Sequence, residues 1–312
     1  MTILAVPAGQ CGSRKHHKAT DLALSKRLVW DLLILQRRAA GWISNDAKSC
    51  FDRVVYWVAI VAMLRFGLTW RVLSSMFNML SMATHRVPTG FGDSDKSFRP
   101  PSAVPFQGCG QGNGAGPPIW ISVSSVLITM MEAMGFGFKA LSAESKLVTA
   151  QCFCFVHDTD VIEAGNTVQH SAEPICPLVQ AAATLWSGGI RATGGAINPE
   201  NSVAPDFELH IPGLSSASEP LRRSEPDALE CTLGVMLAPL ENHKAQEAQL
   251  IGKAKQWAEQ LQYHLLHKYD VIPLIKTTIM KKLEYPMALT TLDAAQWQDI
   301  MSPVLQVWFL LH

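Results

Sequence analysis

Two short acidic segments, each following an apolar run, most constrain what this chain can fold into. The first is Trp42-Ile43-Ser44-Asn45-Asp46, and the second is Phe155-Val156-His157-Asp158 at the end of an apolar run that begins at Val148. Runs of β-forming residues that end in turn-forming residues are typical of strands, so we expect Asp46 and Asp158 at strand ends. A carboxylate in such a position, followed by a turn, is suited to hold a hard cation.

Both segments also have simpler interpretations. Asp46 would cap a following helix, which is a common position for aspartate and the one that the local sequence favours. The cluster from His157 to Asp160 is consistent with a metal site, a hydrogen-bonded buried pair or a hairpin turn, and the turn is the most common of the three.

A glycine-rich segment from Gln107 to Pro117 precedes a long apolar run. Its glycines permit close approach of backbone and ligand, and Pro117 is tolerated in the first turn of the helix that we expect to follow. Gly110, Gly112 and Ala115 also match a loose dinucleotide-binding pattern. A nucleotide-binding oxidoreductase is therefore an alternative, and it requires a strand directly before Gly110.

The other elements are predicted from hydrophobic periodicity and from turn-forming residues. We expect helices at 18–38, at 172–186 with an end at the glycines 188–189, and at 244–268. Residues 51–77 are expected to form either one helix or two helices with a break near 67, residues 87–105 a loop or hairpin, and residues 233–237 a strand.

Composition excludes several classes of protein. Apolar residues make up 48% and charged residues 17%, which is enough apolar sequence for a core and argues against disorder. Lysine plus arginine equals aspartate plus glutamate, at 26 each, so net charge gives no sign of nucleic-acid binding. Seven cysteines without a signal-like segment predict an intracellular protein, of the cytoplasm or nucleus. The apolar stretches 54–64 and 118–138 are expected to be buried helices and not membrane spans.

Taken together and in order, these segments resemble the motifs of reverse transcriptases, particularly those of non-LTR retrotransposons. The resemblance covers residues 10–286. Asp46 to Asp52 resembles motif A, Gln111 to Pro117 motif B, Phe155 to Asp158 motif C, Trp186 to Ser202 motif D, Leu233-Gly234 motif E, and Gly12 to Lys15 the Gly-x-Arg element of the fingers. The ordered set is far more specific than any single motif.

The resemblance implies an α+β fold, the right-hand palm of a polymerase, in which helices back an antiparallel sheet. Partial fingers and a helical thumb-like C-terminal part would accompany it. The implied domains are partial fingers at 1–40, a palm at 41–205 with a fingers-type insertion near 65–105, a linker at 206–228, and the end of the palm with a truncated thumb-like segment at 229–312. The ends of the chain suggest a fragment or a truncated frame.

The implied function is RNA-directed DNA polymerisation, with an RNA template, a DNA primer and dNTPs as partners. We expect no association with a membrane, and the resemblance implies no protein partner. Two-metal nucleotidyl transfer needs several carboxylates to hold Mg²⁺, with Mn²⁺ as the alternative ion. By resemblance, Asp46 and Asp158 are the metal ligands, with help from the backbone carbonyl of Ala47. The implied substrate-binding residues are Phe51 as a steric gate against a 2′-hydroxyl, Gln111 and Gly112 along the nucleotide pocket, and Arg14 at template or phosphate.

The sequence departs from the family pattern at two sensitive positions. His157 stands where motif C has the first aspartate of its pair, and an imidazole is a poorer Mg²⁺ ligand than a carboxylate. Asn201 stands where motif D has a lysine, and an amide is no proton donor of comparable acidity. Asp160 shares a face with Asp158 only if the chain stays extended there. We therefore expect a decayed retroelement copy, impaired or inactive, with a non-catalytic nucleic-acid-binding remnant as the alternative.

Overall fold

The computed structural model describes most of the chain and divides it into two compact units. The described residues are 5–99, 107–110, 112–165, 174–198, 203–205, 210–212, 218–220, 222–224, 230–237, 243–263, 268–287 and 289–310. Unit 1 comprises Met1–His17 and Gln36–Arg223, and unit 2 comprises Lys18–Leu35 and Ser224–His312. Residues 1–40, which we expected to form one fingers element, are thus divided between the two units.

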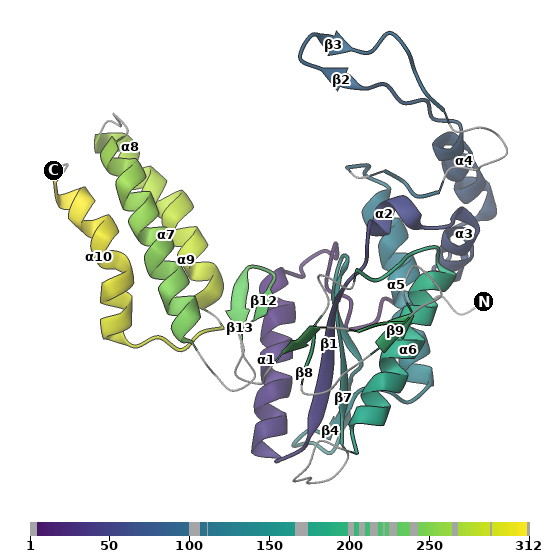
Figure 1. The fold of residues 1–312 in the computed structure, drawn as a ribbon, viewed down its shortest axis with the longest axis horizontal. Helices are drawn as coiled ribbons and strands as arrows, with labels where there is room; N and C mark the ends of the chain where they lie inside the picture. The colour runs from purple at the N-terminus through teal and green to yellow at the C-terminus, as the bar shows by residue number, and fades with distance from the viewer. Residues whose placement is uncertain are drawn as a thin grey trace. The chain divides into compact units, whose positions relative to one another are not determined.

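A five-stranded sheet forms the centre of unit 1, with the strand order β11-β8-β1-β7-β6. Its strands are β1 (Ala40–Asp46), β6 (Cys152–Phe155), β7 (Asp158–Ala164), β8 (Val203–Pro205) and β11 (Arg222–Ser224). The central strand β1 pairs antiparallel with β7 along its whole length, and β7 pairs antiparallel with β6. The mixed helix-and-sheet architecture expected from the sequence is confirmed (Figure 1).

Helices cover this sheet. The helices of unit 1 are α2 (Cys50–Arg53), α3 (Tyr56–Arg65), α4 (Trp70–Ser81), α5 (Gly116–Ala133) and α6 (Cys176–Ala192). Helix α6 packs on β1 and β7, while α5 packs on α6 and α3. Of the two alternatives for 51–77, the break near Gly67 is the one observed, and the chain is also interrupted between α2 and α3. The apolar run after Pro117 is a helix with an extensively buried surface. Among the helices that the structure describes, none has the length and apolar character needed to cross a membrane.

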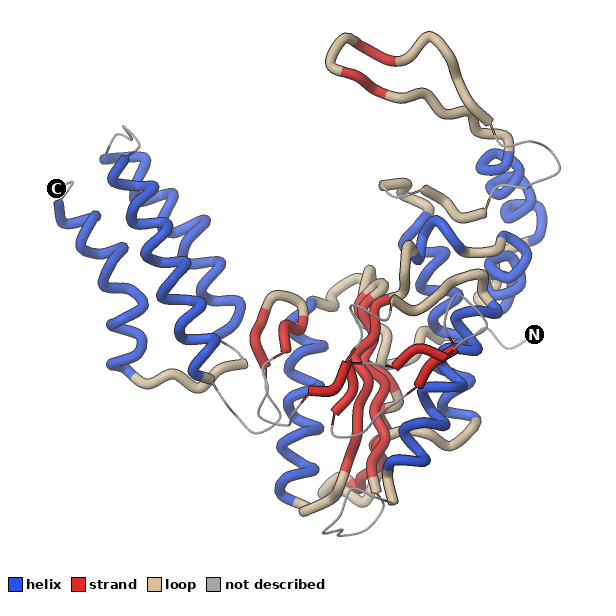
Figure 2. The backbone as a smooth tube through the Cα atoms, in the orientation of Figure 1, coloured by secondary structure: helices blue, strands red, loops and turns tan. Residues whose placement is uncertain are grey.

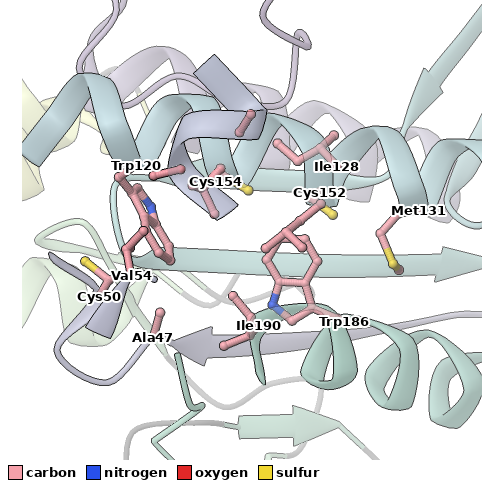
Figure 3. Close-up of a cluster of buried hydrophobic side chains, with 14 of the residues drawn as sticks. Ala47, Cys50, Val54, Trp120, Ile128, Met131, Cys152, Cys154, Trp186 and Ile190 are labelled. Atoms are coloured by element: carbon pink, nitrogen blue, oxygen red, sulfur yellow. The ribbon is translucent and has the colours of Figure 1, made fainter. Parts of the chain in front are cut away.

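The main core of unit 1 lies between these helices and the sheet (Figure 3). Trp120 comes from α5, Trp186 from α6, and Cys152 and Cys154 from β6, and all four are buried. Because successive side chains of a strand point to opposite faces, residues two apart such as Cys152 and Cys154 share a face. These two cysteines therefore help to anchor β6, which leads into the second acidic segment, in the core.

Unit 1 also contains small two-stranded hairpins that are separate from the main sheet (Figure 2). They are β2 (Pro88–Thr89) with β3 (Gly92–Asp93), β4 (Phe138–Leu141) with β5 (Leu147–Ala150), and β9 (His210–Pro212) with β10 (Ser218–Pro220). The β2–β3 hairpin projects away from the main sheet beyond α4 (Figure 1). The β2–β3 pair confirms the hairpin expected within 87–105, of which residues 100–105 lie outside the described part. The expected linker 206–228 is described only in part, and its described residues contribute short strands.

Two predicted boundaries were wrong. Helix α6 does not stop at Gly188-Gly189 but continues to Ala192. A Cβ atom at Gly189 would lie 2.9 Å from a side-chain atom of Leu127 and 2.9 Å from one of Met130. Glycine at that position thus permits the close packing of α6 against α5, and this tertiary packing outweighs the low helix propensity of glycine.

The other wrong boundary concerns the run before the second acidic segment. We expected one strand from Val148 to Val156 that ends at His157-Asp158, whereas the chain forms β5, β6 and, after a turn, β7. Asp158 is therefore the first residue of a strand. Alternation that is as weak as in this run does not separate one long strand from two short ones.

Unit 2 is mainly helical. Its elements are α1 (Ala19–Leu35), β12 (Glu230–Thr232), β13 (Val235–Leu237), α7 (Lys244–Tyr263), α8 (Lys268–Leu274), the π-helical segment η2 (Ile275–Ile279), α9 (Met280–Met287) and α10 (Ala294–Leu310). The buried ammonium of Lys26 in α1 donates a hydrogen bond to the hydroxyl of Thr232 in β12, at 3.2 Å. This long-range contact helps to explain why α1 groups with the C-terminal part of the chain.

A buried carboxyl group lies in unit 1 toward the end of β7. Glu163 is 5% exposed, and its Oε1 accepts a hydrogen bond from the backbone N–H of Gly137 at 2.7 Å. Burial raises the pKa of Glu163 to about 7, although the Gly137 hydrogen bond and the charge of Lys139 both act to lower the pKa. The protonated form of this side chain is therefore the one that the fold prefers.

Glu163 is expected to make the folded state less stable as the pH rises. A raised pKa means that the folded state binds more protons than the unfolded state. The contribution of Glu163 to the free energy of unfolding is therefore fully present below about pH 4.5 and is lost as the pH rises toward 7. The loss amounts to about 3 kcal/mol if the full difference is realised. Glu163→Gln should remove this part of the pH dependence in urea unfolding at pH 5 and pH 8. The exposed Glu144→Gln should not, and an unchanged pH dependence in Glu163→Gln would contradict the assignment.

Candidate metal centre

The pairing of β1 with β7 brings the two acidic segments together. Asp46 is the last residue of β1 and Asp158 the first residue of β7, and the two are partners in the antiparallel register. One ligand atom each from Asp46, His157 and Asp158 lies within 4.8 Å of the others. In the part of the chain that the structure describes, this is the one His/Cys/Asp/Glu group with the geometry to hold a metal ion.

The capping interpretation of Asp46 is wrong. Helix α2 begins at Cys50, its N-cap position is Ser49, and Asp46 belongs to β1. Ser49 adopts a left-handed conformation with φ 50°, which turns the chain sharply between strand and helix. Asp46 therefore ends the strand and does not occupy the capping position of the helix.

The turn that carries His157 is held from two sides. The indole N–H of Trp120 donates a hydrogen bond to the carbonyl of Val156, and the backbone N–H of Ala47 donates one to the carbonyl of His157 at 3.2 Å. Val156 has φ 59°, a conformation that is costly for a β-branched residue. The surrounding contacts must therefore offset this cost, and such strained positions cluster at functional sites.

The end of β1 is fixed by Asn45, a residue that sequence reasoning did not single out. The buried side-chain oxygen of Asn45 accepts a hydrogen bond from the indole N–H of Trp186 at 3.0 Å. Its side-chain nitrogen donates to the carbonyl of Thr159 at 2.9 Å, and the carbonyl of Asp46 accepts from Asn198 at 2.9 Å. A polar amide next to an aspartate in an apolar strand was the available signal, since a buried amide requires partners.

The N-terminal segment lies along the other side of the turn. Cys11 and Gly9 exchange backbone hydrogen bonds with Cys154, at 2.9 and 2.7 Å. A Cβ atom at Gly12 would overlap the backbone of Phe155 and Val156, so only glycine fits there. The glycine of the predicted Gly-x-Arg element is thus required by its contact with the predicted motif C.

Arg14 is not part of the acidic group. Its Nη1 donates hydrogen bonds to the carbonyls of Pro7 and Gln10, at 3.0 and 2.9 Å. These contacts hold the N-terminal loop together. A contact of Arg14 with template or phosphate remains a prediction.

A small cavity lies beside the acidic group. It has a volume of about 200 Å³ and is lined by Asp46, Ala47, Ser49, Cys50, Phe51, Asp52 and His157. The ring of Phe51 lies against Gly116, where a Cβ atom would be 3.1 Å from Cδ1. The structure therefore brings Phe51 and Ala47 to one cavity with two members of the acidic group.

The glycine-rich loop docks on α2 and the residues that follow it. The N–H of Gly108 donates to the carbonyl of Val54 at 2.9 Å, and that of Cys109 donates to the carbonyl of Phe51 at 2.8 Å. A side chain at Gly108 would overlap the backbone of residues 51 and 52. The described residues 107–109 thus form a loop and not the strand that a dinucleotide-binding site would need, so this alternative is wrong for these residues.

Gly112 and Asp160, which the structure describes, do not belong to the acidic group. Gly112 is exposed, whereas Gln111 and Asn201 lie outside the described residues. Asp160 is buried in β7 opposite Ser44, and it is not among the three residues whose ligand atoms converge.

The acidic residues affect the protonation of Asp158. Partial burial of its carboxyl is the main cause that raises the pKa of Asp158; the nearby His157 lowers it, and Asp46 and Asp160 raise it further. The contributions of Asp46 and Asp160 to this shift reflect the negative charge that lies close to Asp158. Such nearby negative charge favours a bound cation over a bare acidic group.

Comparison with known proteins gives only distant similarities. No protein-family model matches the chain, and no curated protein matches it. Similar solved structures include telomerase of Candida albicans in complex with the TWJ fragment of telomeric RNA, with a TM-score of 0.44 and 9% identity over 97% of this chain and 49% of that chain. Telomerase of Candida tropicalis in complex with the TWJ fragment has a TM-score of 0.47 and 12% identity over 97% of this chain and 44% of that chain. Apo telomerase of Candida tropicalis has a TM-score of 0.41 and 13% identity over 96% and 51%.

The similarity to these telomerase structures is weak and partial. The TM-scores lie below 0.5, so the similarity by itself assigns neither a family nor an activity. The chain spans about half or less of the length of these telomerase chains.

Proposed function

We propose that the chain is a reverse transcriptase-like polymerase domain with an impaired metal site, and that the sheet of unit 1 is its palm. The observation that carries the proposal is the direct pairing of Asp46 with Asp158 at one end of β1 and β7, with His157 beside them. The ordered set of motifs supports the same conclusion. The origin in a non-LTR retrotransposon and the thumb-like character of residues 229–312 belong to this proposal and rest on the motifs alone.

The residues present fit a divalent cation, with one unusual donor. Asp46 and Asp158 would hold the ion through carboxylate oxygens, and His157 would offer an imidazole nitrogen. Bound divalent ions would supply charge neutralisation at the attacking and leaving oxygens of nucleotidyl transfer. Mg²⁺ prefers oxygen ligands, so two carboxylates and one imidazole suit Mn²⁺ better than Mg²⁺.

The other cavity residues would select and position the substrate. Phe51 lies in the cavity next to Asp46 and would leave no room for a 2′-hydroxyl, which favours deoxynucleotides. His157 would contribute no negative charge at a position where the reaction requires one, and this deficit is the reason for the proposed impairment.

Metal binding tests the proposal directly. The wild-type protein is expected to bind Mn²⁺ more tightly than Mg²⁺ in a titration followed by electron paramagnetic resonance. Asp46→Asn and Asp158→Asn should each weaken Mn²⁺ binding by about tenfold or more, because each removes a charged ligand. Asp93→Asn changes a carboxylate in the β2–β3 hairpin and serves as the matched control. Equal binding by all four proteins would mean that the acidic group is not a metal site.

A non-catalytic nucleic-acid-binding remnant is the second candidate, and the histidine at position 157 favours it. Such a protein would keep the fold and bind a primer–template without extending it. Its binding should weaken steeply between 50 and about 200 mM salt, because contacts with phosphates release counterions. Absence of binding at low salt would exclude this candidate.

A further inference from the structure

The surface of unit 1 formed by α3 and α5 has an apolar pocket away from the acidic group. Its volume is about 350 Å³, and its lining residues are Trp57, Val58, Val61, Ala62, Arg65, Val123, Val126, Leu127 and Thr193. The residues from α3 recur at helical spacing on one face, as do those from α5. The pocket is therefore a groove between two packed helices whose wall is apolar except at Arg65 and Thr193.

Large apolar side chains at this groove are exposed to solvent. Trp57 is 66% exposed and Val61 59% exposed, although both line the pocket. Trp70, at the start of α4, stacks on Trp57 with 6.0 Å between ring centroids, and is itself 52% exposed. Tryptophan is usually well buried and is enriched among the residues that dominate protein–protein binding energy. Exposed apolar patches of this kind mark interaction sites.

Among the residues that line the groove, the charged one, Arg65, is positive. The sequence between Asp52 and Asp93 contains four arginines and no aspartate or glutamate. Arg65 lines the groove, and Arg71 follows Trp70 in α4. In the part of the chain that the structure describes, neither of these two arginines forms an ion pair. Their charges are thus available to a partner.

We propose that this groove, named here the α3–α5 groove, binds an acidic amphipathic helix of a partner protein. The apolar residues of such a helix, repeated at three- and four-residue spacing, would fill the groove, as in other helix-in-groove complexes. Its flanking carboxylates would pair with Arg65 and Arg71. Nucleic acid fits the charge but not the walls, because the polar edges of a base would be left unpaired against valine and leucine side chains.

The inference is independent of the polymerase proposal and can be tested on the full chain. A phage library of randomised 16-residue peptides would be selected for binding to the wild-type protein. Peptides that also bind the Val61→Glu variant would then be removed. We expect the enriched peptides to carry apolar residues at helical spacing and a net negative charge. Val61→Glu should weaken binding of the best peptide by about tenfold or more, measured by fluorescence anisotropy.

Matched variants separate the groove from its surroundings. Met79→Glu places the same charge on an exposed apolar position of α4 that does not line the groove, and it should leave peptide binding unchanged. Arg65→Glu should weaken binding of the acidic peptide and strengthen binding of a version of the peptide in which its glutamates are replaced by lysines. This charge exchange keeps the test decisive if Val61→Glu fails to fold, which circular dichroism would show.

Several outcomes would overturn the proposal. These are enrichment of basic peptides, enrichment of none, and binding that survives both Val61→Glu and Arg65→Glu. Binding of an 18-nucleotide oligothymidine that is lost in Val61→Glu would instead assign the groove to nucleic acid. A dimer in analytical ultracentrifugation that becomes monomeric in Val61→Glu would assign the groove to a second copy of the chain.

Discussion

Replacing His157 by aspartate is expected to raise Mg²⁺-dependent primer extension by about 100- to 1,000-fold over the wild-type protein. A metal-binding carboxylate contributes several kcal/mol of charge stabilisation, and about 1.4 kcal/mol corresponds to a factor of ten in rate. The new carboxylate would stand in the turn beside Asp46 and Asp158, which already converge there. Extension of a DNA primer on an RNA template, with Mg²⁺ and Mn²⁺ compared, is the measurement.

The controls for this reversion follow from the same site. His157→Asn has nearly the size of the aspartate but no charge, so it should not restore extension. Asp46→Asn in the His157→Asp background should abolish whatever is gained. The expectation fails if His157→Asp is folded and binds Mg²⁺ yet extends no primer, because the impairment would then have a second cause. Asn201, at the predicted position of the proton donor, would be the next residue to change.

Trp186→Ala is expected to lower the stability of unit 1 by about 3–5 kcal/mol, the usual cost of deleting a large buried aromatic side chain. Trp186 is 2% exposed in the core between α6 and the sheet. Its removal also leaves the amide oxygen of Asn45 without its donor, which adds the cost of an unsatisfied buried polar group. Urea unfolding followed by circular dichroism measures the change.

Two further variants make this result specific. Trp186→Phe keeps most of the apolar volume but loses the N–H donor, so it should cost less than the alanine substitution and still loosen the strand end at Asp46. Trp57→Ala removes a tryptophan that is 66% exposed and should change the stability by about 0.5 kcal/mol or less. Equal losses for Trp57→Ala and Trp186→Ala would contradict the packing described for α6.

The sequence predicted the helices and strands of the candidate site better than the contacts between them. Local patterns placed Asp46 at a strand end and located the helix after Pro117, because both depend on neighbouring residues. The register of β1 on β7 and the partners of Asn45 depend on residues more than 100 positions away. No local propensity contains that information, so the sequence predicted the convergence of the two aspartates only through the resemblance.

The place of α1 in unit 2 also depends on a contact that is distant in sequence. The periodicity of α1 correctly predicted a helix, and the resemblance places this helix in a fingers element at 1–40, whereas the compact units group it with the C-terminal part of the chain. The buried hydrogen bond of Lys26 with Thr232 joins it to a strand that the chain forms two hundred residues later. A buried lysine on an amphipathic helix is a signal for such a partner, although the sequence does not identify which residue it is.

The turn at Val156-His157 has a consequence for how this protein could change over generations. The hydrogen bonds from Trp120 and Ala47 to this turn are both accepted by backbone carbonyls, those of Val156 and His157, and Gly12 approaches the backbone of Val156 closely. These hydrogen bonds therefore do not depend on which side chain occupies position 157. A histidine codon becomes an aspartate codon by a change of its first base alone, so the chain stands one point mutation away from a three-carboxylate site on an unaltered framework.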